Sequence, residues 1–160
     1  GVVYQAYTTV AGGGVLALDT RTGKELWDSH PASFNNWISE GSPVVHGGRV
    51  YVVGQGGWIF ALDAGSGSLL WSKQPAGGWV HSMPAIAEGR LFAGFQNGIL
   101  VALDAVTGQE LWRYTSADPT YIFGNSIGSS PAVDGGMVFM LGAMSILVLA
   151  GAGGFRRRVR

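Results

Sequence analysis

The sequence predicts an all-β fold: a β-propeller segment of about three four-stranded blades followed by a degraded fourth. The pattern Ala-x-Asp-x-x-x-Gly-x-x-x-Trp occurs three times, starting at Ala17, Ala61 and Ala102. Its period of about forty residues is typical of propeller blades and similar stacked units. The 27 glycines, against 6 prolines, suit short strands joined by tight turns. We expect an open arc of blades, or a fragment of a closed ring of about seven or eight blades.

The middle repeat shows most clearly how one blade is built. Four strand-like stretches joined by glycine-rich turns occupy residues 42–46, 49–54, 58–63 and 68–72. The third repeat keeps the same order, because Pro84 precedes Asp104 by the distance that separates Pro43 from Asp63. The sequence therefore predicts two consecutive blades in the same register.

The two end repeats depart from this pattern. We divide the single propeller segment, residues 1–160, into blades at residues 1–29 (partial), 42–74, 82–115 and 129–160 (degraded). The first repeat lacks its opening strand, since Val3-Tyr4 aligns with Val50-Tyr51 after an insertion around residues 11–14. In the fourth repeat, Gly151 stands at the Asp position and Val159 at the Trp position.

Residues 137–155 also allow a different interpretation. This run carries no charged residue and is followed at once by three arginines, so its length and its basic flank resemble a membrane span. Several glycines within the run, and the blade register that continues through Phe139, favour strands instead. We favour the degraded blade and keep membrane contact through residues 137–155 as the alternative.

The repeated motif combines a turn, a small residue and a tryptophan. The Asp side chain can accept hydrogen bonds from backbone N–H groups of the turn, and the Gly can take the positive φ that the turn requires. The Trp lies on the outermost strand, where it can pack against the next blade, because one blade has no core of its own. We assign this structural role to Ala17, Asp19, Gly23, Trp27, Ala61, Asp63, Gly67, Trp71, Ala102, Asp104, Gly108 and Trp112.

The composition argues against several other functions. The net charge is zero and basic residues gather at residues 156–160, so no basic stripe for nucleic acid is present. Cysteine is absent, which excludes disulfides, zinc–thiolate sites and a cysteine nucleophile. His30, His46 and His81 are too scattered in sequence for a metal cluster. We predict no catalytic residue and no metal site.

The three motifs resemble the tryptophan-docking motif of PQQ-type (quinoprotein-like) β-propeller repeats. The resemblance covers residues 1 to about 139 and is specific for the family, but not for one function. The family includes quinone-dependent alcohol and sugar dehydrogenases. It also includes propellers without a cofactor, such as the lipoprotein of the outer-membrane β-barrel assembly machinery and sensor domains of membrane-bound kinases. The resemblance implies a periplasmic or extracellular location.

The segments that lead into the blades carry the least repetitive residues of the chain. Propellers of the family that this chain resembles place ligands on the face formed by these segments and by the connections between second and third strands. Aromatic and amide groups on one rim would suit a ligand or a peptide, although ordinary loop variation explains them too. The candidate rim residues are Asn36, Trp37, Glu40, Trp79, His81, Tyr121 and Asn125.

A quinoprotein dehydrogenase is the main alternative. The resemblance implies that such an enzyme holds calcium with Glu, Asn and Asp oxygens beside PQQ, and uses an Asp as base. Glu40 resembles the Glu that contacts this cofactor, but His81 and Gly128 occupy the same position in the next repeats. We expect no cofactor for this chain alone, and PQQ with calcium if the dehydrogenase interpretation holds.

The function we expect is that of a binding or protein–protein scaffolding module. Its partner would be another protein or the remaining blades of a larger propeller, and not nucleic acid. We also expect self-association, because an arc leaves its end faces uncovered. The alternatives are a fragment of a PQQ-dependent dehydrogenase and the sensor region of a membrane protein.

Overall fold

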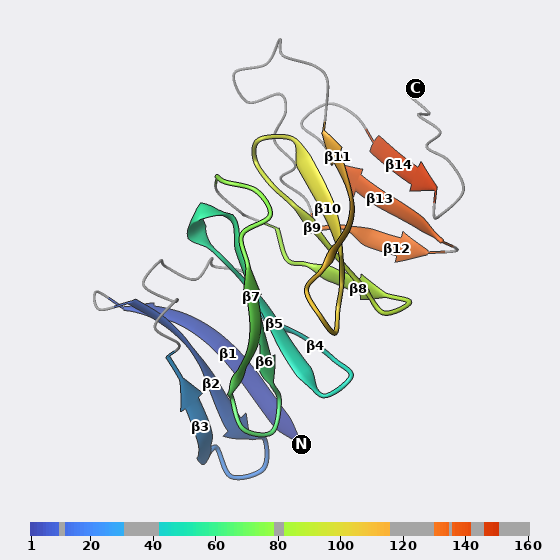
Figure 1. Cartoon of the computed structure of the whole chain (residues 1–160). Coiled ribbons are helices and arrows are strands. Elements are labelled where there is room, and N and C mark those ends of the chain that lie inside the picture. Colours follow the sequence, from blue (N-terminus) through green and yellow to red (C-terminus); the bar gives the residue numbers. More distant parts are fainter. Residues whose placement is uncertain are drawn as a thin grey trace.

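The computed structural model describes residues 1–9, 12–30, 42–78, 82–115, 130–134, 136–141 and 146–150. In this part of the chain, regular structure consists of strands and one short 3-10 turn, η2 (Gln55–Gly57). The strands form four antiparallel sheets that follow one another along the chain (Figure 1). The predicted all-β propeller segment is confirmed.

Within each sheet, neighbouring strands are consecutive in the sequence. The first sheet contains β1 (Val2–Thr9), β2 (Gly12–Asp19) and β3 (Glu25–Ser29). The second contains β4 (Val44–His46), β5 (Arg49–Gly54), β6 (Trp58–Asp63) and β7 (Leu69–Lys73). The third contains β8 (Ala85–Ala87), β9 (Arg90–Gly94), β10 (Ile99–Asp104) and β11 (Glu110–Thr115). The fourth contains β12 (Ala132–Asp134), β13 (Met137–Leu141) and β14 (Ile146–Ala150).

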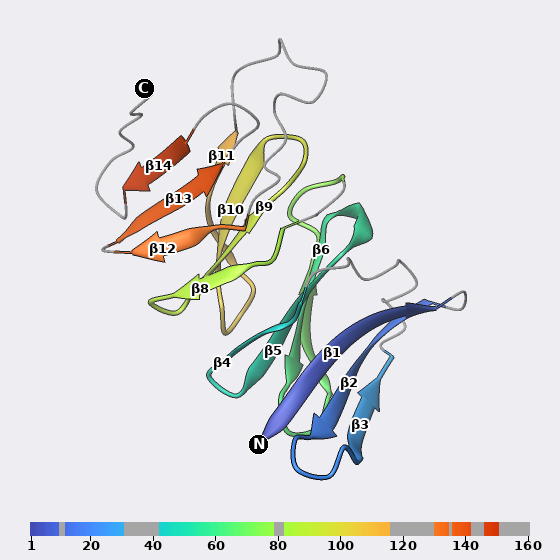
Figure 2. The same ribbon diagram turned by 180° about the vertical axis from the view of Figure 1, so that it is seen from behind.

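The four sheets stand side by side in an arc, with the first sheet at one end and the fourth at the other (Figures 1 and 2). The opening strands lie close together along one edge of the arc, where β4 contacts β8 and β8 contacts β12. The last strands, β3, β7 and β11, carry the motif tryptophans. This arrangement places each tryptophan at the far edge of its sheet from the opening strands.

Burial follows the position of each sheet in the arc. The four middle residues of β6 and of β10 are all buried, because these sheets have a neighbour on both faces. In β1 no residue is fully buried, and half-buried residues interrupt exposed ones. The first sheet is therefore covered on one face only by the described part of the chain.

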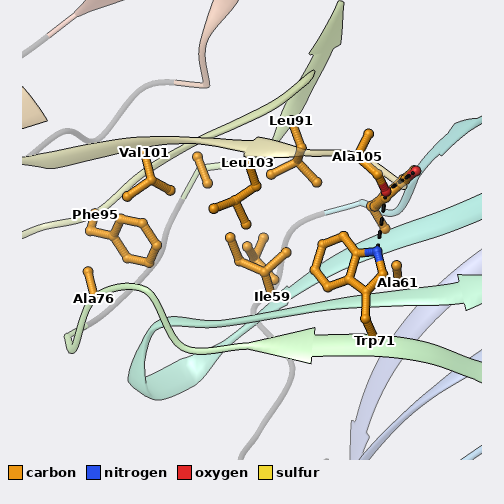
Figure 3. Close-up of a cluster of buried hydrophobic side chains, with 12 residues drawn as sticks. Ile59, Ala61, Trp71, Ala76, Leu91, Phe95, Val101, Leu103 and Ala105 are labelled. Carbon is orange, nitrogen blue, oxygen red and sulfur yellow. Dashed lines mark hydrogen bonds between the residues drawn. The ribbon is translucent and has the colours of Figure 1, made fainter. Parts of the chain in front are cut away.

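Three hydrophobic clusters join consecutive sheets. The first contains Val15 of the first sheet with Val50 and Leu62 of the second. In the second cluster, side chains of the second and third sheets point toward one another, with Ile59 facing Leu103 (Figure 3). The third contains Phe92, Leu100, Ala102 and Val138, and so joins the third sheet to the fourth. Each interior cluster thus lies between two sheets, as expected for stacked repeats.

The first sheet lacks an opening strand, as the sequence predicts. The expected insertion around residues 11–14 does not interrupt the sheet, because β1 pairs with β2 continuously from Val2↔Asp19 to Thr9↔Gly12. The glycines of β2 extend this hairpin beyond the length of β5 and β6. Residues 10 and 11 lie outside the described part of the chain.

The fourth sheet corrects one assignment made from the sequence. In the second and third sheets, Arg49 pairs with Asp63 and Arg90 pairs with Asp104. In the fourth sheet, the equivalent Met137 pairs with Ala150, so Ala150 and not Gly151 occupies the Asp position. The hairpin between β13 and β14 is one residue shorter than the sequence spacing implies. A change of hairpin length shifts strand register in this way.

The described residues of the uncharged run 137–155 are in two paired strands, β13 and β14. Among the described residues, no helix is long and apolar enough to cross a membrane. In this part of the chain, the interpretation as a degraded blade is therefore the one that the structure matches.

Candidate docking and binding surfaces

The turn after the second-last strand has the same geometry in the first three sheets. The Asp Oδ1 atom accepts hydrogen bonds from the backbone N–H groups two and three residues later, at 2.7–3.0 Å. It also accepts one from the hydroxyl of Thr22, Ser66 or Thr107, at 2.7–2.9 Å. Gly23, Gly67 and Gly108 close the turns with φ values of 69°, 73° and 69°. The turn is thus a rigid, repeated unit.

These bonds favour the ionised carboxylate. The hydroxyl of Thr22 lowers the pKa of Asp19, and the hydroxyl of Ser66 lowers the pKa of Asp63. At Asp104 the backbone N–H of Thr107 is the largest cause of the lowered pKa. The charged acceptor therefore holds each turn in place at neutral pH.

The tryptophan of one sheet binds to the turn of the next sheet. The Trp27 Nε1 atom donates to the Ala64 carbonyl at 3.1 Å, and the Trp71 Nε1 atom donates to the Ala105 carbonyl at 3.2 Å. Both acceptors directly follow the Asp of the turn, and Figure 3 shows the bond from Trp71. Each bond gives an acceptor to an indole N–H that packing would otherwise bury without one.

Each tryptophan belongs to a row of three residues, which we call the docking row. It consists of an aromatic residue, an alanine and the tryptophan on three neighbouring strands. The rows are Tyr4–Ala17–Trp27, Tyr51–Ala61–Trp71 and Phe92–Ala102–Trp112. The two rings lie 5.6–6.0 Å apart between centroids, across an alanine that is fully buried in every row. A larger residue in the middle would separate the rings.

The tyrosines of the first two rows bind the same carbonyl groups as the tryptophans. The Tyr4 hydroxyl donates to Ala64 at 3.0 Å, and the Tyr51 hydroxyl donates to Ala105 at 2.9 Å. Burial raises the pKa of Tyr51, which keeps this donor protonated. One carbonyl oxygen thus accepts two donors from the preceding sheet, and both of its lone pairs are used.

The glycine of the receiving turn gives the indole ring its space. A Cβ atom on Gly67 would lie 2.6 Å from the Trp27 ring, and a Cβ atom on Gly108 would lie 2.8 Å from the Trp71 ring. The Ser29 hydroxyl adds a bond of 2.6 Å to the Gly67 carbonyl. These glycines therefore serve both the turn and the contact between sheets.

At the third junction Phe92 replaces the tyrosine. Trp112 is half-buried and packs with Phe92, and Val138 of the fourth sheet completes the cluster. The phenylalanine has no hydroxyl, so this row has lost one of its two polar groups. The fourth sheet packs against the third through the apolar side chains of Val133 in β12 and Val138 in β13.

All seven candidate rim residues lie outside the described part of the chain: Asn36, Trp37, Glu40, Trp79, His81, Tyr121 and Asn125. The described residues 74–78 show how one rim segment begins. The Gln74 amide donates to the Gly56 carbonyl at 2.8 Å, and the Asn97 amide donates to the Gly77 carbonyl at 2.8 Å. Hairpins of two sheets thus hold the start of this segment.

A polar cluster that the sequence did not indicate lies on the first sheet. The Tyr7 hydroxyl is 2.7 Å from Asp28 Oδ1 and 2.8 Å from His30 Nε2, and His30 and Asp28 are 3.0 Å apart. Burial and the Asp28 carboxylate raise the pKa of Tyr7. The ring crosses Gly14, where a Cβ atom would lie 2.5 Å from it. The sequence signal for this cluster was Gly14, which pairs with Tyr7 and lies within the glycine run at residues 12–14.

The described residues offer no donor set that fits calcium and a quinone. No group of three or more His, Asp or Glu side chains that could hold a metal occurs in the described ranges. Glu40 lies outside them. The hollow between the second and third sheets is lined by Lys73, Gln74, Pro75, Leu103, Thr107, Gly108, Gln109 and Glu110.

Successive sheets joined by aromatic–alanine–tryptophan rows define a β-propeller segment of the PQQ type. The family model described as outer membrane protein assembly factor BamB matches residues 11–157, and the chain belongs to this family. Among curated proteins, no sequence matches the chain.

Several solved structures share the fold. BamB from Moraxella catarrhalis is 24% identical with a TM-score of 0.73, covering 92% of this chain and 46% of that protein. A quinohemoprotein alcohol dehydrogenase from Pseudomonas putida is 20% identical with a TM-score of 0.75, covering 96% of this chain and 32% of that one. The computationally designed Ika4 protein is 15% identical with a TM-score of 0.72, covering 93% and 86%. The chain thus spans less than half of the two natural relatives.

Proposed function

We propose that the chain is a propeller module that binds another protein in outer-membrane protein assembly, outside the cytoplasm. The family model carries this proposal, because it is described as an outer-membrane protein assembly factor and matches almost all of the chain. The resemblance to dehydrogenases is one of fold alone at 20% identity. This resemblance of fold assigns no residue of this chain to a reaction.

The contacts between consecutive sheets support the role of a rigid scaffold for loops. Two donors from one sheet meet a single carbonyl of the next at both the first and the second junction. The start of the segment at residues 74–78 is fixed by Gln74 and Asn97. Loops held on a rigid scaffold are the usual place for binding residues, since they lose little conformational freedom on binding.

The binding experiment uses the outer-membrane protein assembly complex depleted of its own member of this family. The immobilised chain should bind it saturably, and joint replacement of Trp37, Trp79 and Tyr121 by Ser should weaken binding by at least about tenfold. Val106→Ser is the matched control, because Val106 is 55% exposed in a turn at the other end of the third sheet. No binding, or equal binding by the rim variant, would contradict the proposal.

We also propose that this chain alone does not bind PQQ tightly. The described residues gather no donor group for the metal that accompanies this quinone, and Glu40 is a single match. Absorbance titration with PQQ and calcium, on the wild type and on Glu40→Gln, tests this. Saturable micromolar binding that Glu40→Gln removes would favour the dehydrogenase alternative.

A further inference from the structure

Strand pairing brings the side chains of Tyr7, Asp28 and His30 together on one face of the first sheet. Tyr7 of β1 pairs with Gly14 of β2, and Leu16 of β2 pairs with Asp28 of β3. The Tyr7 ring lies over Gly14, where a Cβ atom would be 2.5 Å from the ring. The glycine therefore lets a phenol on β1 reach across β2 to the polar residues of β3.

Three side-chain groups that can bind metal ions meet at this point. The Tyr7 hydroxyl oxygen is 2.7 Å from Asp28 Oδ1, 2.9 Å from Asp28 Oδ2 and 2.8 Å from His30 Nε2. The His30 Nε2 atom is 3.0 Å from Asp28 Oδ2. Two ligand atoms about 2.0–2.2 Å from an ion, and at right angles to each other, lie about 3 Å apart. The three groups thus have the spacing of one triangular face of a coordination shell.

The packing of one sheet on the next does not require this cluster. The equivalents of the three residues, counted from the docking rows, are Gly54, Ser72 and Gln74 in the second sheet and Phe95, Arg113 and Thr115 in the third. These two sheets pack against their neighbours without a Tyr–Asp–His group at this place. The combination is thus particular to the first sheet.

The cluster is open to solvent and has a negative charge. The His30 side chain is 58% exposed and the Asp28 side chain is 31% exposed, so an ion can reach both. The negative charge of Glu25, on the same strand as Asp28, also acts on the Tyr7 hydroxyl. This environment favours a cation over an anion.

The donor atoms favour a divalent transition-metal ion over calcium. Calcium takes six to eight oxygen ligands, whereas imidazole nitrogen is a usual ligand of zinc, copper and nickel. Among the divalent ions of the first transition row, Cu²⁺ generally binds a given set of nitrogen and oxygen ligands most tightly. One imidazole, one carboxylate and one phenol make up such a set.

We propose that Tyr7, Asp28 and His30 form a binding site for a divalent transition-metal ion, with Cu²⁺ as the ion of highest affinity. The imidazole, the carboxylate and the phenolate would each supply a ligand, and water would take the remaining positions. The phenol proton, which the hydroxyl otherwise donates to Asp28, would pass to solvent when the oxygen binds the ion.

This site differs from the expectation of no metal site. Only two of its ligands are His, Asp or Glu side chains, and the third is a phenol. The spacing of residues 7, 28 and 30 in the sequence does not show that they meet over Gly14. Metal binding here goes beyond the proposed binding of another protein and does not depend on it.

Titration of the full chain with copper(II) sulfate tests the proposal, in a buffer that contains glycine to compete for weak sites. The wild type should bind one ion saturably and gain a phenolate-to-copper charge-transfer band in the visible spectrum. Tyr7→Phe should abolish this band. Tyr7→Phe, Asp28→Asn and His30→Asn should each weaken binding by at least about tenfold. Excess calcium should not displace the copper.

Two variants give matched controls, and a third separates ligand position from ligand identity. His46→Asn and Glu25→Gln change exposed residues outside the cluster and should leave the charge-transfer band unchanged. Gly14→Ala keeps all three ligands, but its methyl group would displace the Tyr7 ring, so the band should be lost. Circular dichroism before each titration shows whether the variant is folded.

Three results would overturn the proposal. The first is the absence of saturable copper binding by the wild type. The second is unchanged affinity in a folded Asp28→Asn or His30→Asn variant, which would assign the ion to another part of the chain. The third is bound copper without the phenolate band, which would exclude Tyr7 as a ligand. None of these readouts involves a partner protein, so they stay separate from the binding experiment above.

Discussion

The junction between the second and third sheets differs from the junction between the third and fourth. At the former, Trp71 is 9% exposed and Tyr51 is 1% exposed, and both donate to the Ala105 carbonyl. At the latter, Phe92 has no hydroxyl and Trp112 is only half-buried. The contact between two sheets therefore depends on both the docking row of one sheet and the turn of the next. Where the fourth repeat has lost its motif, the row that faces it has changed as well.

The largest expected effect is that of truncating the buried tryptophan. Trp71→Ala should lower the free energy of unfolding by about 3–5 kcal/mol, because it leaves a cavity and removes one of the two donors to the Ala105 carbonyl. Trp112→Ala should cost less, since Trp112 is half-buried. Urea unfolding followed by circular dichroism measures both. Equal losses would show that the two junctions are of similar strength, contrary to the comparison.

The next effect separates the backbone strain of a turn from its contact with a ring. Gly108→Ala should cost about 1–3 kcal/mol more than Gly23→Ala, because the added Cβ atom would lie 2.8 Å from the Trp71 ring. Gly23 has the same φ of 69° and nothing within 4 Å, so it reports strain alone, about 1–2 kcal/mol. Similar losses for the two variants would mean that Gly108 does not receive the indole.

Removing one hydroxyl should have a smaller effect. Tyr51→Phe should cost about 1 kcal/mol, because the buried Ala105 carbonyl keeps its bond from Trp71. Tyr4→Phe is the matched variant at the first junction and should cost less, since Tyr4 is half-buried. A loss at Tyr4 that exceeds the loss at Tyr51 would reverse the order of burial on which this prediction depends.

The smallest expected effect is the acid dependence of the turns. The lowered pKa values of Asp19, Asp63 and Asp104 contribute stability above the ordinary Asp pKa of about 3.9. This contribution should be lost as the pH falls through the lowered values, because protonation removes the acceptor. Asn at any of the three positions should flatten the acid limb of the stability curve by a similar amount.

If the three turn variants differed strongly from one another, the turn would depend on the tryptophan that lies on it. Asp19, whose turn receives no described tryptophan, would then be the one that departs.

Much of the fold could be predicted because the repeat encodes it locally. The spacing of Asp63 and Gly67 defines a turn, and Trp71 follows at a fixed distance, so sheet order and outer strands follow from the pattern. The register of the fourth sheet could not be predicted, because Ala150 and Gly151 are both small and only the hairpin length decides between them.

The candidate sites were less accessible to sequence reasoning. Contact between Tyr7, Asp28 and His30 requires three strands to align over Gly14, which sequence separation does not show. The shared acceptor at Ala105 is a backbone atom and has no sequence signature. The rim residues stay a prediction, since they lie outside the described residues.

The exchange rates of the tryptophan indole N–H protons, followed by NMR, test the docking of one sheet on the next most directly. The Trp71 indole proton should exchange slowly, because it is bound to the buried Ala105 carbonyl. The Trp58 indole, which has no acceptor among the described residues, should exchange fast, and Gly108→Ala should accelerate Trp71 without changing Trp27. A Trp71 proton that exchanges as fast as that of Trp58 would contradict the account.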